Sequence, residues 1–189
     1  MTLDSYNGDR TNWLYLNTAD GPCKDQAFRQ ALAYGIDRQA YMDSYYKLDE
    51  SDEVMAYVPS SFGNLISKTC GSIVTRKEKL NGLNTYEYSP EKAEQLLDYA
   101  GWKVGSDGIR EKDGERLSIR FLSIKEKDNM DSMIPILQKD WQEIEIELKA
   151  NTMEFNTINS TISDDNTLGD WDAGWIGFSN GSPEDTGMN

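Results

Sequence analysis

The sequence predicts an α/β fold, because stretches of alternating apolar and polar residues are interleaved with stretches whose apolar residues recur at helical spacing. At 189 residues the chain can bury a hydrophobic core without help from disulfides or metals. Aliphatic, aromatic and sulfur-containing residues make up 38% of it, which fits a globular protein and not a disordered one. We therefore expect a single folded domain over residues 1–189.

The first part of the chain predicts a strand, two short helices and a long irregular segment. Residues 12–17 alternate polar with apolar or aromatic side chains and end at turn-forming residues 18–22. Beyond Asp25 the apolar residues with helical spacing are Phe28, Leu32 and Ile36. Asp37 can cap a second helix, which carries Ala40, Tyr41 and Tyr45. Residues 47–88 show no sustained period and predict an irregular excursion over the surface.

The middle of the chain predicts a helix and a hairpin. Ser89 is a candidate cap before Pro90, and an apolar stripe follows at Ala93, Leu96, Leu97 and Ala100, ending at Gly101. The pairs Asp107-Gly108 and Asp113-Gly114 predict turns on either side of residues 109–112, and residues 117–122 then alternate as a strand. A calcium-binding EF-hand loop is the alternative for this stretch, but its fixed oxygen ligands and closing glutamate are absent.

The last part of the chain predicts two further helices and two further strands. Residues 127–142 carry an apolar stripe at Met130, Met133, Ile134, Leu137 and Trp141, and Pro135 should kink this helix or shift its start. Strands are predicted at residues 144–148 and 172–176, and a weaker helix lies between them at residues 153–162.

Charge excludes two classes of partner. The formal net charge of −14 and the pI of about 4.4 oppose binding to nucleic acid or to an anionic membrane surface. There is no apolar run of 18 residues, and the first six residues lack the basic and apolar regions of a signal peptide. We expect neither a membrane-spanning segment nor a targeting signal in this sequence.

One motif points toward catalysis. Residues 177–181 match the nucleophile-elbow pattern G-x-S-x-G, with Ser179 as the candidate nucleophile after a predicted strand. The chain contains no histidine, so no Ser-His-Asp relay can be assembled from it, and Pro183 leaves no room for the helix that follows an elbow. The pairs Asp164-Asp165 and Glu184-Asp185 remain as candidate bases, but adjacent acids in polar loops are usually only solvated. We expect no enzymatic activity, and a serine hydrolase using Ser179 is the alternative.

No cofactor or metal site is predicted. The glycine and lysine spacing of a P-loop and the dinucleotide-binding fingerprint are absent. The two cysteines lack paired metal-ligand spacing, and they permit one intramolecular disulfide between Cys23 and Cys70.

Aromatic residues lie on or beside the ends of predicted strands, where open α/β sheets place ligand crevices. They are Trp13, Phe155, Trp175 and Phe178. Aromatic walls would suit peptides or sugars, and the alternative is that these side chains pack in the core or at a hinge.

Four segments carry a resemblance when they are taken in order. They are Leu16-Asn17-Thr18 with DQAFRQALAYGIDR over residues 25–38, YSPEKAEQLL from Tyr88 leading to Ala100-Gly101-Trp102, Met153-Glu154-Phe155, and Gly169-Asp170-Trp171-Asp172 leading to Gly174-Trp175. Together these segments resemble the peptide/nickel/dipeptide-binding family of ABC-transporter solute-binding proteins. The resemblance covers nearly the whole chain.

The resemblance implies a place in a larger fold. It implies one lobe of a class II periplasmic-binding-protein-like fold, a mixed β-sheet flanked by helices, lying between the two crossover strands of a two-lobe protein. It further implies an extracytoplasmic location, as a periplasmic protein or a cell-surface lipoprotein, and partnership with the permease subunits of an ABC importer. We expect a monomer that captures an oligopeptide or dipeptide-like solute in the cleft between two lobes and delivers it to the permease, with a purely structural or adhesive surface domain as an alternative.

The resemblance also implies a ligand site. The matching positions are Trp13, Phe155, Trp175, Ile176, Gly177, Phe178 and Ser179. In oligopeptide binders a Trp is followed three residues later by an Asp that pairs with the ammonium of the peptide, whereas Phe178 occupies that position here. Glu184 or Asp185 could replace this Asp, and otherwise the ligand lacks a free amine, for example a sugar, a modified peptide or a nickel complex. Cys23 lies where the family commonly has an apolar residue, which implies a buried thiol as the alternative to a disulfide.

Overall fold

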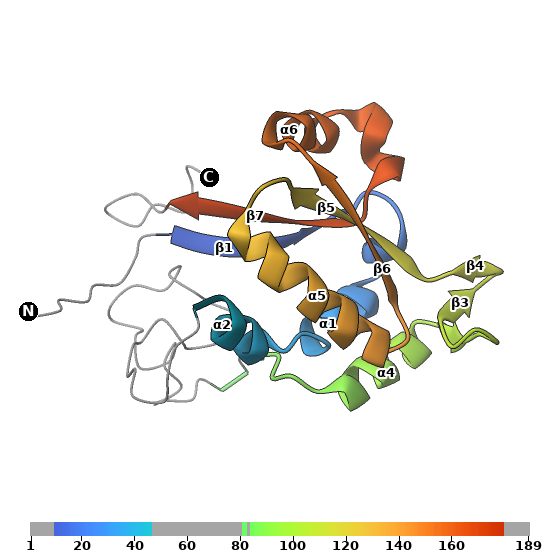
Figure 1. The fold of residues 1–189 in the computed structure, drawn as a ribbon. Coiled ribbons are helices and arrows are strands. Elements are labelled where there is room, and N and C mark those ends of the chain that lie inside the picture. The colour runs from blue at the N-terminus through green and yellow to red at the C-terminus, as the bar shows by residue number, and fades with distance from the viewer. Residues whose placement is uncertain (1–9, 47–80, 83, 180–189) are drawn as a thin grey trace, which may run out of the picture. The chain divides into compact units, whose positions relative to one another are not determined.

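The computed structural model describes residues 10–46, 81–82 and 84–179, and it confirms a mixed α/β fold (Figure 1). The chain divides into two compact units. The larger comprises Leu14–Asp37 and Tyr86–Trp175, and the smaller comprises Met1–Trp13, Arg38–Thr85 and Ile176–Asn189. That these units form a single domain stays a prediction.

Strands β1 (Arg10–Leu16) and β7 (Ala173–Ser179) each run from one unit into the other along the chain. Helix α2 (Arg38–Tyr46) lies in the smaller unit. The remaining elements of the larger unit are η1 (Pro22–Lys24), α1 (Gln26–Tyr34), α4 (Pro90–Tyr99), β2 (Lys103–Val104), β3 (Arg110–Lys112), β4 (Glu115–Arg116), β5 (Ser118–Ile124), α5 (Asp128–Glu143), β6 (Glu147–Met153), α6 (Phe155–Ser163) and η5 (Asp165–Asp170).

The main sheet has the strand order β1-β7-β5-β6. Strand β5 pairs in parallel with β6 along its whole length, from Ser118 opposite Glu147 to Ile124 opposite Met153. On its other side β5 pairs in parallel with β7. Helix α5 connects β5 to β6, and α6 with η5 connects β6 back to β7. Strands β2, β3 and β4 form a separate antiparallel sheet.

Helices cover both faces of the parallel strands. Phe121 of β5 packs against Trp141 of α5, with ring centroids 6.5 Å apart, whereas its neighbour Leu122 packs in a cluster with Ile158 of α6. Because successive side chains of a strand point to opposite faces, α5 and α6 lie on opposite sides of the sheet, as Figure 1 shows. The core is therefore two-layered around β5.

Most of the predicted elements are confirmed within a few residues. Ser89 occupies the predicted N-cap position of α4, with Pro90 at its first turn, but its hydroxyl donates to the Glu91 carboxylate at 3.1 Å and forms no side-chain cap hydrogen bond. Of the two effects predicted for Pro135, a shifted helix start is wrong, since α5 begins at Asp128 and continues through the proline, and a kink stays a prediction. The Asp25 carboxylate does cap α1, accepting from the Ala27 N–H at 2.8 Å.

The strand predicted at residues 144–148 begins three residues later, at Glu147. Glu145 has φ 58°, and the N–H of Ile146 donates to the Trp141 carbonyl, so the chain turns here at the end of α5. Ile144 and Ile146 are fully buried in this turn. Their alternation therefore reflects burial and not an extended strand.

The predicted hairpin is also different in extent. Residues 110–112 pair with the short strand β4 across the turn at Asp113-Gly114, and the strand that follows belongs to the other sheet. Most of the irregular segment predicted at residues 47–88, including Cys70, lies outside the described residues. Within the described ranges, no helix is long and apolar enough to cross a membrane.

Asp140 of α5 is a buried carboxylate with a structural role. It is 1% exposed, and its Oδ2 accepts a 2.8 Å hydrogen bond from the backbone N–H of Asp37, where the chain turns from α1 to α2. Burial raises the pKa of Asp140 above its ordinary value. The ammonium group of Lys139, which is 75% exposed and 3.7 Å from Oδ1, only partly offsets this burial.

Replacing Asp140 with asparagine is expected to raise the free energy of unfolding at pH 7, because the amide oxygen keeps the Asp37 contact without a buried charge. The raised pKa means that the native state binds the Asp140 proton more tightly than the unfolded state, so wild type recovers stability as pH falls through that pKa. Urea denaturation at pH 7 and pH 4 should show the gain shrinking at the lower pH. Asp131→Asn, an exposed position on the same helix, should give no gain.

Candidate functional site

Strands β5, β6 and β7 are parallel, so within the larger unit the segments that follow β5 and β6 and the residue Trp175 of β7 lie toward the same edge of the sheet. The chain leaves β5 toward β6 on one side and returns to β7 on the other, with crossover helices on opposite faces. This arrangement makes a topological switch point between β5 and β7. In open α/β sheets, ligands bind in the crevice outside the carboxyl ends at such a point.

Two of the predicted site residues lie at this edge. Trp175 of β7 follows Gly174, which is paired with Leu122 of β5, and it is half-buried. Phe155 begins α6, two residues after the end of β6, and is 47% exposed. Of the two strands that flank β5, β7 therefore carries Trp175 as its third residue, and β6 is followed by Phe155 just beyond its end.

The other predicted positions lie in the smaller unit. Trp13 is 37% exposed on β1, and Ile176 is half-buried on β7. Residues 177–179, which include Phe178 and Ser179, belong to β7 by their backbone, and their side chains lie outside the described part of the chain. Glu184 and Asp185 also lie outside it. The role of all these residues in ligand binding stays a prediction.

Charged side chains that the sequence analysis missed lie beside Phe155. The Lys125 ammonium lies 3.4 Å from the Glu154 carboxylate and 3.6 Å from that of Glu126, and the Lys125 N–H donates to the Met153 carbonyl at 3.0 Å. All three charged side chains are more than half exposed, so the pairs add little stability and remain open to exchange with a charged ligand. Their signal in the sequence was their position directly after strands β5 and β6.

A network of hydrogen bonds around Asp172 fixes the chain just before the start of β7. Asp172, 1% exposed, accepts hydrogen bonds from the Arg120 guanidinium at 2.7 and 2.8 Å and from the Arg120 N–H at 2.8 Å. Its own carbonyl accepts from the N–H of Asn17 at 2.8 Å. The end of β1 and the start of β7 are thereby held together, and Trp175 is only three residues beyond this point.

Cys23 lies close to the Asp172 and Arg120 side chains and is fully buried. Burial, and secondarily the nearby Asp172 carboxylate, raises the pKa of the Cys23 thiol to about 12, so it is protonated at physiological pH. Its predicted partner Cys70 is outside the described residues, so the disulfide stays a prediction.

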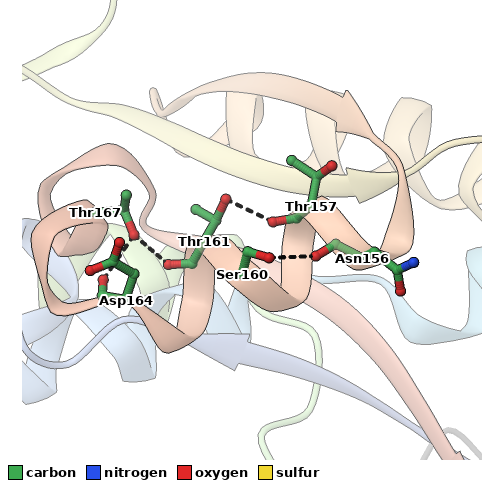
Figure 2. Close-up of a pocket in the computed structure, with 6 residues that line it drawn as sticks. All are labelled: Asn156, Thr157, Ser160, Thr161, Asp164 and Thr167. Atoms are coloured by element: carbon green, nitrogen blue, oxygen red, sulfur yellow. Dashed lines mark hydrogen bonds between the residues drawn. The ribbon is translucent and has the colours of Figure 1, made fainter.

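A separate polar hollow of about 320 Å³ lies over α6 and η5 (Figure 2). It is lined by Asn156, Thr157, Ser160, Thr161, Asp164 and Thr167. The hydroxyls of Ser160 and Thr161 donate to carbonyls one turn earlier, and that of Thr167 donates to the carbonyls of Thr161 and Asp164. Because these hydroxyl protons are already engaged by the main chain, the hollow has the character of an internally satisfied helix surface. Among the described residues, no group of three or more Cys, Asp or Glu could hold a metal ion.

Known proteins resemble this chain over most of its length. The family model described as bacterial extracellular solute-binding proteins, family 5 Middle, matches residues 2–188. The oligopeptide-binding protein AppA of Bacillus subtilis is 29% identical over 157 residues, which are 82% of this chain and 26% of AppA. The nickel-binding periplasmic protein of Escherichia coli is 32% identical over 137 residues, 71% of this chain and 23% of that protein.

Solved structures agree with the sequence relatives. NikA from Brucella suis in complex with Fe(III)-EDTA superimposes with a TM-score of 0.68 at 28% identity, over 94% of this chain and 32% of NikA. AppA from Bacillus subtilis in complex with a nonapeptide superimposes with a TM-score of 0.65 at 25% identity, over 90% of this chain and 33% of AppA. The chain thus spans 23–33% of the length of these relatives. It belongs to the bacterial extracellular solute-binding proteins of family 5.

Proposed function

We propose that this chain forms one lobe of the solute-binding component of an ABC importer, and that the captured solute is an oligopeptide or a dipeptide-like molecule. The observation that carries the proposal is the pair of aromatic side chains, Phe155 and Trp175, at the carboxyl edge of a parallel sheet with a switch point. The name and the bound nonapeptide of the relative AppA support the choice of a peptide. The second lobe of the full-length protein would close over the ligand by a hinge motion.

The proposed protein works outside the cytoplasm, as a periplasmic protein or a surface lipoprotein, and delivers its solute to permease subunits without chemical change. The absence of histidine from the chain supports a non-enzymatic role, because the commonest general base is missing. A fluorophosphonate probe tests the serine-hydrolase alternative. Labelling of wild type that is lost in Ser179→Ala would contradict the proposal, and we expect no labelling.

Nickel chelates are the second candidate ligand, because the relatives include a nickel-binding protein and NikA with Fe(III)-EDTA. Thermal-shift titration of the full-length protein with defined peptides, a nickel–histidine mixture and sugars separates these classes, since a ligand of the native state raises the apparent melting temperature. We expect the peptides to raise it. A shift with the nickel mixture alone would replace the peptide by a metal chelate, and no shift with any solute would contradict the receptor function.

Alanine at Trp175 or Phe155 is expected to weaken, by about tenfold or more, the binding of a peptide that raises the melting temperature, because aromatic residues contribute most of the binding energy at such interfaces. Tyr99→Ala is the matched control, since Tyr99 is an 86% exposed aromatic on α4 and not at the sheet edge. Isothermal titration calorimetry measures all three. Equal affinity of the Trp175 variant and the Tyr99 variant would show that the edge is not the site.

A further inference from the structure

Tyr15 of β1 lies directly against Gly174 of β7. A Cβ atom built on Gly174 would come within 2.8 Å of Tyr15 Cε1, and closer still to its Cζ and hydroxyl oxygen. Real Cβ atoms do not approach other atoms so closely, and the conformation of Gly174 is not one that requires glycine. Position 174 therefore holds glycine because the phenol of Tyr15 fills the space that a side chain would need.

Packing, and not hydrogen bonding, holds the Tyr15 ring. The ring meets that of Trp171 edge to face, with centroids 5.6 Å apart and an interplanar angle of 64°. It also packs on the cluster of Leu122 and Ile158 between the sheet and α6. Burial raises the pKa of Tyr15 to about 12, and its buried hydroxyl has no hydrogen-bond partner among the described residues. Rotating the ring off Gly174 would take it out of this cluster, so the contact is a fixed one.

The contact between Tyr15 and Gly174 lies one residue before Trp175, the first residue of β7 that is predicted to contact the ligand. On one side, strand pairing holds Gly174 opposite Leu122. On another, the Tyr15 phenol closes off the space over the Gly174 Cα. The backbone that carries Trp175 is thus confined by β5 and by Tyr15 together.

We propose that Tyr15 is a positioning residue for Trp175: by packing on Gly174 it sets where the Trp175 ring stands at the carboxyl edge of the sheet. The inference rests on the proposed function, since it gives Tyr15 a part in ligand affinity through Trp175. A binding site whose supporting shell is loose loses affinity even when every contacting residue is present. Tyr15 itself is not expected to touch the ligand.

The first test compares two truncations in the full-length protein. Tyr15→Ala is expected to weaken peptide binding about tenfold, whereas Ile158→Ala should leave affinity within about twofold of wild type, since Ile158 belongs to the same cluster and the atoms nearest to a Cβ built on Gly174 are all from Tyr15. Tyr15→Phe should bind like wild type, because the hydroxyl has no partner to lose. Equal losses of affinity in Tyr15→Ala and Ile158→Ala would show that the cluster acts only through stability and would overturn the proposal.

The second test reads Trp175 without any ligand. In protein labelled with 5-fluorotryptophan, the Trp175 resonance is identified by its absence in Trp175→Phe, and we expect it to shift or broaden in Tyr15→Ala and to be unchanged in Ile158→Ala. Gly174→Ala should perturb the same resonance, and the double variant Tyr15→Val with Gly174→Ala should restore it by making room for the new methyl group. An unperturbed resonance in Tyr15→Ala would overturn the positioning role.

The two readouts separate this inference from the proposed function. If the Trp175 fluorine signal is perturbed in Tyr15→Ala but the protein binds no solute, Tyr15 positions Trp175 and the receptor function is wrong. The proposed contribution of Tyr15 to ligand affinity is then overturned. Normal signals in a protein that binds peptide would leave the receptor function correct and the inference wrong.

Discussion

Replacing Arg110 with alanine lowers the free energy of unfolding by about 3–5 kcal/mol in our expectation, the range for breaking a buried ion pair by removing one partner. The guanidinium is 3% exposed and lies 2.7 Å from Asp98, 3.0 Å from Glu145 and 2.9 Å from the Trp102 carbonyl. These contacts tie the small sheet to α4 and to the turn before β6. Because the Asp98 side chain is 57% exposed, water can solvate its carboxylate after Arg110 is removed. The loss of stability should therefore fall near the lower end of this range.

Arg116 offers a matched control for Arg110. It also pairs with two carboxylates, those of Asp107 and Glu147, but its side chain is 42% exposed. Alanine there should cost far less stability than alanine at Arg110, as for other surface ion pairs. Urea denaturation of both variants measures the difference, and equal losses would contradict the importance of burial.

The dependence of stability on pH in the acid range gives a second test of the ion pair between Arg110 and Asp98. Its hydrogen bond to Asp98 lowers the pKa of that carboxyl group. A lowered pKa means that the stabilisation is present above the ordinary pKa of aspartate and is lost as pH falls through the lowered value. Arg110→Ala should therefore lose less stability on acidification than wild type does.

Local patterns predicted the elements whose burial and hydrogen bonding are local. Helix α4 followed from its proline start and apolar stripe, and strand β1 from its alternation. The same kind of pattern misled at Ile144 and Ile146, because two buried residues spaced by one also occur in a turn with a left-handed residue between them. Alternation reports burial, and it reports a strand only where the backbone is extended.

The contacts that shape the site could not be predicted in this way. Phe155 and Trp175 were found because each lies at the end of a predicted strand, which is a local signal. The packing of Tyr15 on Gly174 joins residues 159 positions apart, and it depends on β7 lying between β1 and β5. Arg110 likewise read as part of a polar hairpin strand, because its burial comes from partners on α4 and on the turn before β6. Strand order and helix docking are tertiary properties, so no pattern within a single element contains them.

Asn17 is the second position at which we expect a large effect. Its side chain, 3% exposed, makes four hydrogen bonds at the end of β1. The amide nitrogen donates to the carbonyls of Leu168 and Trp171 at 2.7 and 2.9 Å, and the amide oxygen accepts from the N–H groups of Ala19 and Asp20 at 3.0 and 3.2 Å. Asn17→Ala leaves all four groups without this partner and should cost about 2–4 kcal/mol, measured by urea denaturation.

Asn17→Asp separates the two halves of this network. The carboxylate keeps an oxygen for Ala19 and Asp20 but presents a second oxygen to the two carbonyls, so it should be at least as destabilising as alanine if the donated bonds to Leu168 and Trp171 dominate. Asn166→Ala is the control, because its amide makes an exposed contact with Asp164, and it should cost less than about 0.5 kcal/mol. If Asn17→Asp were as stable as wild type, the turn at Ala19 and Asp20 would be what Asn17 stabilises, and the link from β1 to the segment before β7 would contribute little. A destabilised Asn17→Asp instead makes this one amide the point where the first strand holds the chain segment that leads to Trp175.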